Sequence, residues 1–435
     1  MLFYDRDASG RSWHKNPVLS FFSYLRDTCV FFLPLRRLPY FLVKFLYGVS
    51  PQYIFFVHAR RTEDIYVALP FLVPVRKILG RDKFIKMLYY LPPFVLDTLK
   101  NRNGPQGLVV TSIFLSEILL KDSKAALRES TKGLSFAAKI SPKGVVFGLG
   151  GLWPMVTKRG LALQRYAAIN NAIITNGHCG TLASLFMAIK KIADLGGIPL
   201  NDLKVVILGV GKMGTNLARA LYGKVAALTL VDINEKRLDS VEEKLKNTIS
   251  GTDIYKYSNR DDIGGIKEVL SANHIGVCTT SNIRRVVKPE QFPENTIVID
   301  DSRPEGMPRK LEGDTRIVLE GGLMKIKGIK YRYNFGFGVD ENVFGCLAES
   351  YLLASDKLRT LRPTLGEVDI ANFQNMVSSC SKFGVRLGDF KCRQNRINNS
   401  RIISIMKNKP NLASTIPFRN VCWIIKVEDL QNILK

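Results

Sequence analysis

The sequence has few cysteines and none in a pattern typical of metal sites. Its seven cysteines form no CxxC pair and no cluster with histidine at zinc-ligand spacing. An odd number of widely scattered cysteines also does not suit a disulfide framework. We therefore expect no metal, and we expect the reducing environment of the cytoplasm. A single cysteine could still serve as a nucleophile.

Long uncharged hydrophobic runs are absent near the N-terminus. The first 16 residues mix acidic and basic side chains and carry no cleavage signal, so they do not resemble a signal peptide. Residues 18–49 are rich in Phe, Leu and Tyr, but charges and prolines interrupt them before the roughly 18–20 residues of a spanning helix. This composition is typical of an interfacial segment on an anionic membrane; a buried helical hairpin is the alternative.

Acidic residues are scarce, with 38 Asp and Glu against 63 Lys and Arg, and the formal charge is +25. Such a field favours anionic partners: nucleic acid, an anionic membrane or an acidic protein such as an acyl carrier protein. Composition is otherwise that of a folded protein, and 435 residues allow two or three domains.

Apolar strands alternate with amphipathic helices along most of the chain. We expect strands at residues 53–59, 108–115, 274–280, 295–301 and 316–322, and helices at 66–79, 82–91, 120–140, 182–195, 343–361 and 368–383. This alternation predicts an α/β fold, in which a Rossmann-like doubly wound parallel sheet is joined to a second α/β substrate domain and a helical C-terminal part.

A glycine-rich motif follows the strand LKVVIL and precedes a helix. In the segment Gly209-Val-Gly211-Lys-Met-Gly214 the first glycine allows a tight turn and the second lets the backbone approach a pyrophosphate. The third lets the helix pack closely on the strand. The phosphates would lie at the helix start near Lys212 and Met213, and we expect Thr279 to line the same site.

Asp232 ends the next strand, where a carboxylate can accept hydrogen bonds from the adenosine ribose. This favours NADH over NADPH, because a 2′-phosphate would be repelled. Lys236 and Arg237 follow closely, however, and could hold that phosphate, so both cofactors stay open.

Seven further segments resemble, in order, the long-chain acyl-acyl-carrier-protein reductases, which form fatty aldehydes. The resemblance covers roughly residues 53–391. It is carried by the glycine motif together with FFVHARRTED (55–64), FLSEIL (114–119), LGGLWPMV (149–156), TNGHCGT (175–181), IVIDDSRPE (297–305), VLEGG (318–322) and VFGCLAESYLL (343–353).

The resemblance implies a cysteine thioester mechanism with NADPH or NADH. It makes Cys346 the acyl-carrying nucleophile, and a helix start there would also stabilise a thiolate. It implies that the TNGHCGT loop, with Thr175, Gly177 and Thr181, contacts the nicotinamide end. The substrate would be an acyl-carrier-protein or acyl-CoA thioester, with no nucleic acid partner.

Two further groups are candidates for the reduction step. His178, in the same loop, could protonate the aldehyde oxygen or the leaving thiol, although a structural loop histidine is an equal alternative. The backbone of Gly150 and Gly151, or of Gly177, could donate N–H groups to the developing oxyanion.

The sequence departs from this family at Asp232 and Ile233, at His178 and Gly180, and in both terminal segments. Other interpretations are a glutamyl-tRNA reductase-like enzyme, a shikimate dehydrogenase-like enzyme and a non-catalytic nucleotide sensor on membranes. We expect five parts: a basic aromatic segment (1–50), a substrate domain (51–181), a dinucleotide domain (182–340), a helical segment with the nucleophile (341–391) and a basic tail (392–435).

Overall fold

A computed structural model describes residues 10–11, 25, 40–59, 62–141, 144–246, 251–258, 265–280, 287–302, 305–309, 313 and 315–409. The chain forms two compact units. The first unit consists of Met1–Ala183 and Gly322–Asp389, and the second of Ser184–Gly321 and Phe390–Lys435. Most of the expected interfacial segment, and the tail after residue 409, lie outside the described residues.

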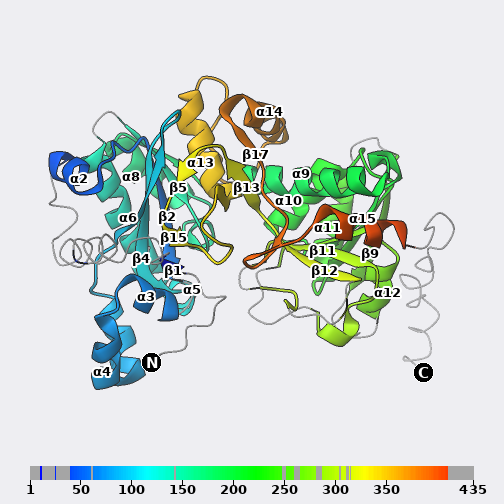
Figure 1. Ribbon diagram of the computed structural model, residues 1–435, viewed down its shortest axis with the longest axis horizontal. Coiled ribbons are helices and arrows are strands. Elements are labelled where there is room, and N and C mark those ends of the chain that lie inside the picture. The colour runs from blue at the N-terminus through cyan, green and yellow to red at the C-terminus, as the bar shows by residue number, and fades with distance from the viewer. Residues whose placement is uncertain are drawn as a thin grey trace, which may run out of the picture. The chain divides into compact units, whose positions relative to one another are not determined.

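The first unit is built on a six-stranded sheet (Figure 1). Strands β4, β2, β5 and β6 run parallel to one another. Strand β3 runs antiparallel to β4, and β14 runs antiparallel to β3. In order across the sheet the strands are β14 (Ile329–Lys330), β3 (Phe94–Asn101), β4 (Gly107–Leu115), β2 (Tyr53–Ala59), β5 (Val145–Leu149) and β6 (Ala172–Thr175). Every residue of β4 and β5 is buried, which explains their mainly apolar sequence; the exceptions in β4 are Thr111 and Ser112.

Helices cover both faces of this sheet. A Cβ on Gly133 of α6 would lie 2.6 Å from the Phe56 ring, whereas a Cβ on Gly148 of β5 would meet Ser350 of α13 and Phe55. Since neighbouring strand residues point to opposite faces, α6 and α13 lie on opposite faces of the sheet. The helices of this unit are α2 (Tyr40–Tyr47), α3 (Thr62–Ala68), α4 (Leu72–Leu88), α5 (Ser116–Lys121), α6 (Ser123–Ile140), α7 (Trp153–Val156), α8 (Gln164–Ile169), α13 (Gly345–Asp356) and α14 (Ile370–Cys380).

A small antiparallel sheet leads the chain into α13. Strand β13 (Leu323–Ile326) pairs with β16 (Asn342–Phe344) on one side and with β17 (Val385–Leu387) on the other. Because β16 runs directly into α13, the sheet fixes where that helix begins. Two-stranded pairs join β1 (Gly10–Arg11) to β15 (Tyr333–Asn334), and β18 (Lys391–Cys392) to β19 (Asn395–Arg396).

The second unit contains a parallel six-stranded sheet with the strand order of a dinucleotide-binding fold. The order is β12 (Arg316–Glu320), β11 (Thr296–Asp300), β10 (Ile275–Cys278), β7 (Lys204–Leu208), β8 (Ala227–Asp232) and β9 (Asp253–Ser258). From β7 the successive strands β8 and β9 are added on one side, whereas β10, β11 and β12 are added on the other. The gap between β7 and β10 is therefore the topological switch point, where ligands bind in sheets of this kind. The flanking helices are α9 (His178–Gly196, which begins in the first unit), α10 (Lys212–Leu221), α11 (Glu235–Lys246), α12 (Gly265–Ser271) and α15 (Asn399–Lys407).

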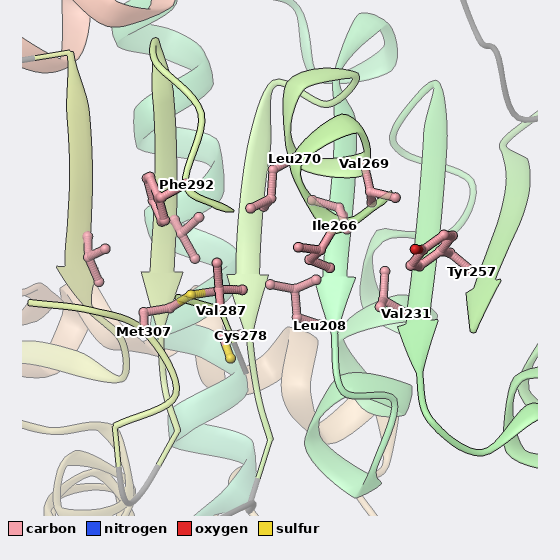
Figure 2. Packing of buried hydrophobic residues seen from close by; sticks show 13 residues of the cluster. Leu208, Val231, Tyr257, Ile266, Val269, Leu270, Cys278, Val287, Phe292 and Met307 are labelled. Atoms are coloured by element: carbon pink, nitrogen blue, oxygen red, sulfur yellow. The ribbon is translucent and has the colours of Figure 1, made fainter. Parts of the chain in front are cut away.

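A buried apolar cluster holds α12 on this sheet. Figure 2 shows Ile266, Val269 and Leu270 of the helix packed with Leu208 and Val231 of the strands, all at most 2% exposed. Burying a side chain of this size contributes roughly 1.5–3 kcal/mol, so the cluster anchors the switch-point strands.

The α/β fold class is confirmed, with parallel sheets and flanking helices. The expected strand at 53–59 coincides with β2. The expected break between the helices at 66–79 and 82–91 is confirmed, because α4 is kinked at Gly80, whose φ is 71°. Their outer bounds were wrong, because α4 begins only at Leu72 and ends at Leu88. The segment 341–391 also contains strands β16 and β17. Among the described residues, no helix is both long and apolar enough to cross a membrane.

Candidate active site

The three motif glycines have different surroundings in the second unit. Gly209 has a φ of 89°, and a Cβ on Gly214 would lie 2.1 Å from the Gly209 carbonyl oxygen. The backbone conformation at Gly209 and the packing at Gly214 therefore require glycine whether or not a ligand is bound. In the part of the chain that the structure describes, no heavy atom of another segment lies within 4 Å of a Cβ built on Gly211. The side-chain-free backbone there faces open space, as close approach of a pyrophosphate requires.

The expected neighbours of the glycine turn lie at the switch point. Lys212 is exposed and Met213 half-buried in the first turn of α10, whose N–H groups and dipole favour phosphate. The Thr279 hydroxyl donates a 2.7 Å hydrogen bond to the Gly209 carbonyl, which joins the ends of β10 and β7. These groups fit a dinucleotide.

Asp232 ends β8 as predicted, and its buried carboxylate already has three partners. It accepts hydrogen bonds from the backbone N–H groups of Val210 and Asn234, both at 3.0 Å. Arg237 forms an ion pair with it at 3.2 Å, and the arginine side chain is 48% exposed. The acid suited to ribose and the cation suited to a 2′-phosphate are thus in contact, and the site suits NAD(P)H.

Cys346 is the second residue of α13 and is half-buried. The loop after β6 lies directly against it: a Cβ on Gly177 would lie 2.2 Å from the Cys346 Cβ and 2.7 Å from its Cα. Gly177 also has a φ of 74°, so both space and backbone conformation require glycine there.

Two more glycines bring the starts of α9 and α13 together. A Cβ on Gly180 would lie 2.2 Å from the Gly345 carbonyl oxygen, and one on Gly345 would lie 2.6 Å from the Gly180 carbonyl oxygen. The first unit therefore gathers Cys346 with the loop that contains Thr175, His178 and Thr181. Thr181 donates through its hydroxyl to the Gly177 carbonyl at 3.2 Å, which closes the loop.

His178 is half-buried at the start of α9. Burial, with a smaller effect of the Arg159 guanidinium, lowers the pKa of His178 to about 4. The imidazole is therefore neutral at neutral pH. Its Nδ1 is buried and has no hydrogen-bond partner within the described part of the chain, so this nitrogen can exchange a hydrogen bond with a substrate.

Glu349 is a site residue that the sequence analysis missed. It lies one helical turn after Cys346 and is fully buried. Its carboxyl group accepts hydrogen bonds from the Thr175 hydroxyl, from the Gly180 N–H at 2.7 Å and from the Thr364 N–H at 3.3 Å. Burial raises its pKa. One feature of the sequence could have indicated this role: Glu349 is an acidic residue three positions after Cys346, in a helix whose neighbouring residues are mainly apolar.

The Gly150–Gly151 turn has a structural role. The Gly150 N–H donates to the Phe56 carbonyl at 2.8 Å, so it is engaged in the sheet rather than available to an oxyanion. Beside Gly151, His58 accepts a 3.1 Å hydrogen bond from the Leu152 N–H through Nε2. Its Nδ1 lies 2.9 Å from the Ala59 carbonyl, which fixes the tautomer with the proton on Nδ1.

No family model matches this chain. A curated long-chain acyl-acyl-carrier-protein reductase of Synechococcus elongatus is 24% identical over 295 residues, 62% of this chain and 80% of that protein. Alanine dehydrogenases of Staphylococcus epidermidis are 46% identical over 50 residues, 11% of this chain and 14% of theirs.

Among solved structures, the similarity extends over much of the chain in one case, at a low TM-score. The 5-ketofructose reductase of a Gluconobacter strain is 13% identical, with a TM-score of 0.32 over 76% of this chain and 98% of that chain. The fold therefore rests on the strand order of the chain itself. Together with the nucleotide turn, the curated relatives support an NAD(P)-dependent oxidoreductase as the broad class. No metal-binding group of His, Cys, Asp or Glu occurs among the described residues.

The different surroundings of Gly211 and Gly214 allow an effect on ligand binding to be distinguished from an effect on folding. We expect Gly211→Val to weaken NAD(P)H binding at least about tenfold, or about 1.4 kcal/mol, without lowering the melting temperature, because only the ligand would meet the new side chain. Gly214→Ala should lower the melting temperature, because its Cβ overlaps the Gly209 carbonyl. Fluorescence titration and calorimetry measure both. Unchanged binding by Gly211→Val would place the phosphates elsewhere.

Proposed function

We propose that this chain is an NAD(P)H-dependent reductase that takes an acyl group from a carrier thioester onto Cys346 and releases it as an aldehyde. The observation that carries the proposal is the placement of Cys346. It lies at a helix start, directly against Gly177, and the next residue in that loop is the neutral His178. The distant reductase relative supports the same reaction class.

In the first step the Cys346 thiolate attacks the acyl carbonyl carbon. A new carbon–sulfur bond forms, the bond to the carrier sulfur breaks, and the carrier leaves as a thiol after it takes a proton. One thioester replaces another, so little free energy separates reactant and product. The first-turn N–H groups and the dipole of α13 stabilise the thiolate before the attack.

In the second step the thioester is reduced and Cys346 is released. NAD(P)H supplies a hydride when bound. The residues of this chain must stabilise the oxyanion at the former carbonyl, and the sulfur takes up a proton from water. We assign the oxyanion to N–H groups at the start of α13 and in the Gly177 loop. The neutral imidazole of His178, next to Gly177, would donate a hydrogen bond to the same oxygen.

The carrier in this proposal is an acyl carrier protein or coenzyme A. The formal charge of +25 supports an acidic carrier, and the relative is named for an acyl-carrier-protein substrate. Between the cofactors, we propose a preference for NADH, because Asp232 is held in place by two backbone N–H groups.

The other interpretations have less support. A glutamyl-tRNA reductase-like mechanism needs a nucleophilic cysteine ahead of the dinucleotide fold, but only Cys29 precedes residue 179. A shikimate dehydrogenase-like enzyme would need a Lys–Asp pair in an N-terminal substrate domain. Peripheral membrane association stays a proposal; in its favour, Phe41 and Phe45 of α2 are 71% and 82% exposed.

Acyl transfer can be measured without cofactor. Wild-type protein mixed with acyl-carrier-protein or acyl-CoA thioester should gain the mass of one acyl group, whereas Cys346→Ser should gain none. Cys392→Ser removes another half-buried thiol and serves as the control, which should be acylated normally. If wild-type protein gains no acyl group from either carrier, the thioester mechanism is wrong, and a nucleotide-sensing role becomes the better interpretation.

The lowered pKa of His178 has a consequence for stability. Its value is 6.5 in a model peptide and about 4 in the fold, so the folded chain binds fewer protons than the unfolded chain between these pH values. The free energy of unfolding should fall as the pH drops through this range. His178→Asn should show a shallower fall in urea titrations, with His274 contributing the same background to both. Equal slopes would contradict a buried neutral His178.

A further inference from the structure

Glu349 has no chemical role in the reaction proposed above, yet its burial requires an explanation. Its side chain is 0% exposed, and no Lys or Arg in the described part of the chain forms an ion pair with it. A buried carboxyl group without a cation costs free energy unless hydrogen bonds compensate. The three donors around Glu349 supply this compensation, so their origin indicates what the residue does.

These donors come from two segments far apart in the sequence. The Thr175 hydroxyl and the Gly180 N–H stand on either side of Gly177 and His178, and the third donor is the Thr364 N–H beyond α13. The Thr364 N–H also donates to the Thr175 hydroxyl oxygen at 3.0 Å. Glu349 thus ties both ends of the loop to the helix that carries Cys346.

Loss of this carboxyl group would release the loop from Cys346. The buried N–H group of Gly180 would lose its acceptor, at about 1–3 kcal/mol for an unsatisfied group, whereas the Thr364 N–H would keep the Thr175 hydroxyl oxygen. Gly177, which lies directly against Cys346, stands between the two ends of the loop that Glu349 holds. Without Glu349 we expect the loop to move relative to Cys346.

We propose that Glu349 is a positioning residue that holds the Thr175–Gly180 loop on Cys346 and so sets the geometry of the reduction step. The inference rests on the proposed function. Acyl transfer needs the thiolate and its helix start, whereas reduction also needs the loop, and the loop donates two of the three hydrogen bonds that the Glu349 carboxyl group accepts. The two steps should therefore respond differently to its loss.

Single-turnover kinetics test this difference. In Glu349→Ala, the rate of acyl transfer to Cys346 should stay within about threefold of wild type, while reduction of the acyl-enzyme by NAD(P)H should fall on the order of 100-fold, as misplacement by about 1 Å does in other enzymes. The reduction rate of Glu349→Gln should lie between those of wild type and Glu349→Ala. The amide oxygen of the glutamine still accepts a hydrogen bond from the Gly180 N–H, whereas its NH₂ group cannot accept one from the Thr364 N–H.

A matched control is Glu129→Gln. Glu129 is also a buried carboxyl group of the first unit, on α6, with partners Ser112 and Lys132. Glu129→Gln should lower stability without changing the ratio of the two rates.

If Glu349→Ala does not fold, Thr175→Val removes one donor and should slow reduction selectively. Equal slowing of both steps, or wild-type reduction, would overturn the positioning role. Failure of wild-type acylation would instead overturn the proposed function.

A separate observation points to a second site, a pocket of about 520 Å³ on the first unit. It is lined by Lys86 of α4, Arg128 and Lys132 of α6, and Tyr89 and Tyr90. Lys132 pairs with Glu129 at 3.1 Å. Among the described residues no acid pairs with Lys86 or Arg128, so the pocket has unbalanced positive charge.

Its aromatic wall suits a ligand with an apolar part beside a phosphate. The Tyr89 ring packs on Phe114 with centroids 5.3 Å apart, whereas Tyr90 is 85% exposed. Amphipathic rings beside Lys and Arg are typical of sites at the level of lipid headgroups. We infer that this pocket binds a phosphate group, presented by an anionic lipid.

Vesicle sedimentation tests this site in the full chain. Binding to phosphatidylglycerol vesicles should fall at least about fivefold in a Lys86→Gln and Arg128→Gln double variant. The charge-matched control, Lys83→Gln with Lys124→Gln on the same helices, should retain it. Calorimetry of both double variants with inorganic pyrophosphate separates the sources, because any binding at the glycine turn is common to both. If wild type binds no vesicles, and pyrophosphate binding falls only in the Lys86→Gln and Arg128→Gln variant, the ligand is a soluble phosphate and not a lipid. Equal losses in both double variants would overturn the site.

Discussion

The close approach of two backbones at Gly177 and Cys346 is the constraint on which the candidate active site depends. A side chain at Gly177 would overlap the cysteine, and side chains at Gly180 and Gly345 would separate the starts of α9 and α13. Glycine at these positions costs conformational entropy on folding. In exchange, the backbone of the loop lies directly against Cys346, with no side chain at Gly177 between them.

The contact of Gly177 with Cys346 needs further interactions that hold the loop in place, because packing between two backbone segments contributes little free energy. Glu349 supplies them by accepting hydrogen bonds from both ends of the loop. Hydrogen bonds to a carboxyl group in a buried site are stronger than those at the surface, and the lack of a cation leaves the group dependent on them. Folding of the first unit and geometry at Cys346 are therefore coupled through one side chain.

Local patterns gave most of the fold, and non-local contacts account for what was missed. Strand β2 and the glycine turn could be predicted because a buried apolar run and a GxGxxG motif depend on neighbouring residues. Glu349 was missed because its partner Gly180 lies 169 residues away. The engagement of the Gly150 N–H was equally hidden, since only the pairing of β2 with β5 brings Phe56 to it.

Cofactor choice depends on which member of the Asp232–Arg237 pair can move. Two backbone N–H groups hold the acid, which is buried, whereas the arginine side chain is about half exposed. A 2′-phosphate would have to draw Arg237 away from Asp232 and still lie near the fixed negative charge. A ribose hydroxyl needs only a remaining lone pair of the carboxylate. The fixed acid is therefore the physical basis of the proposed preference for NADH over NADPH.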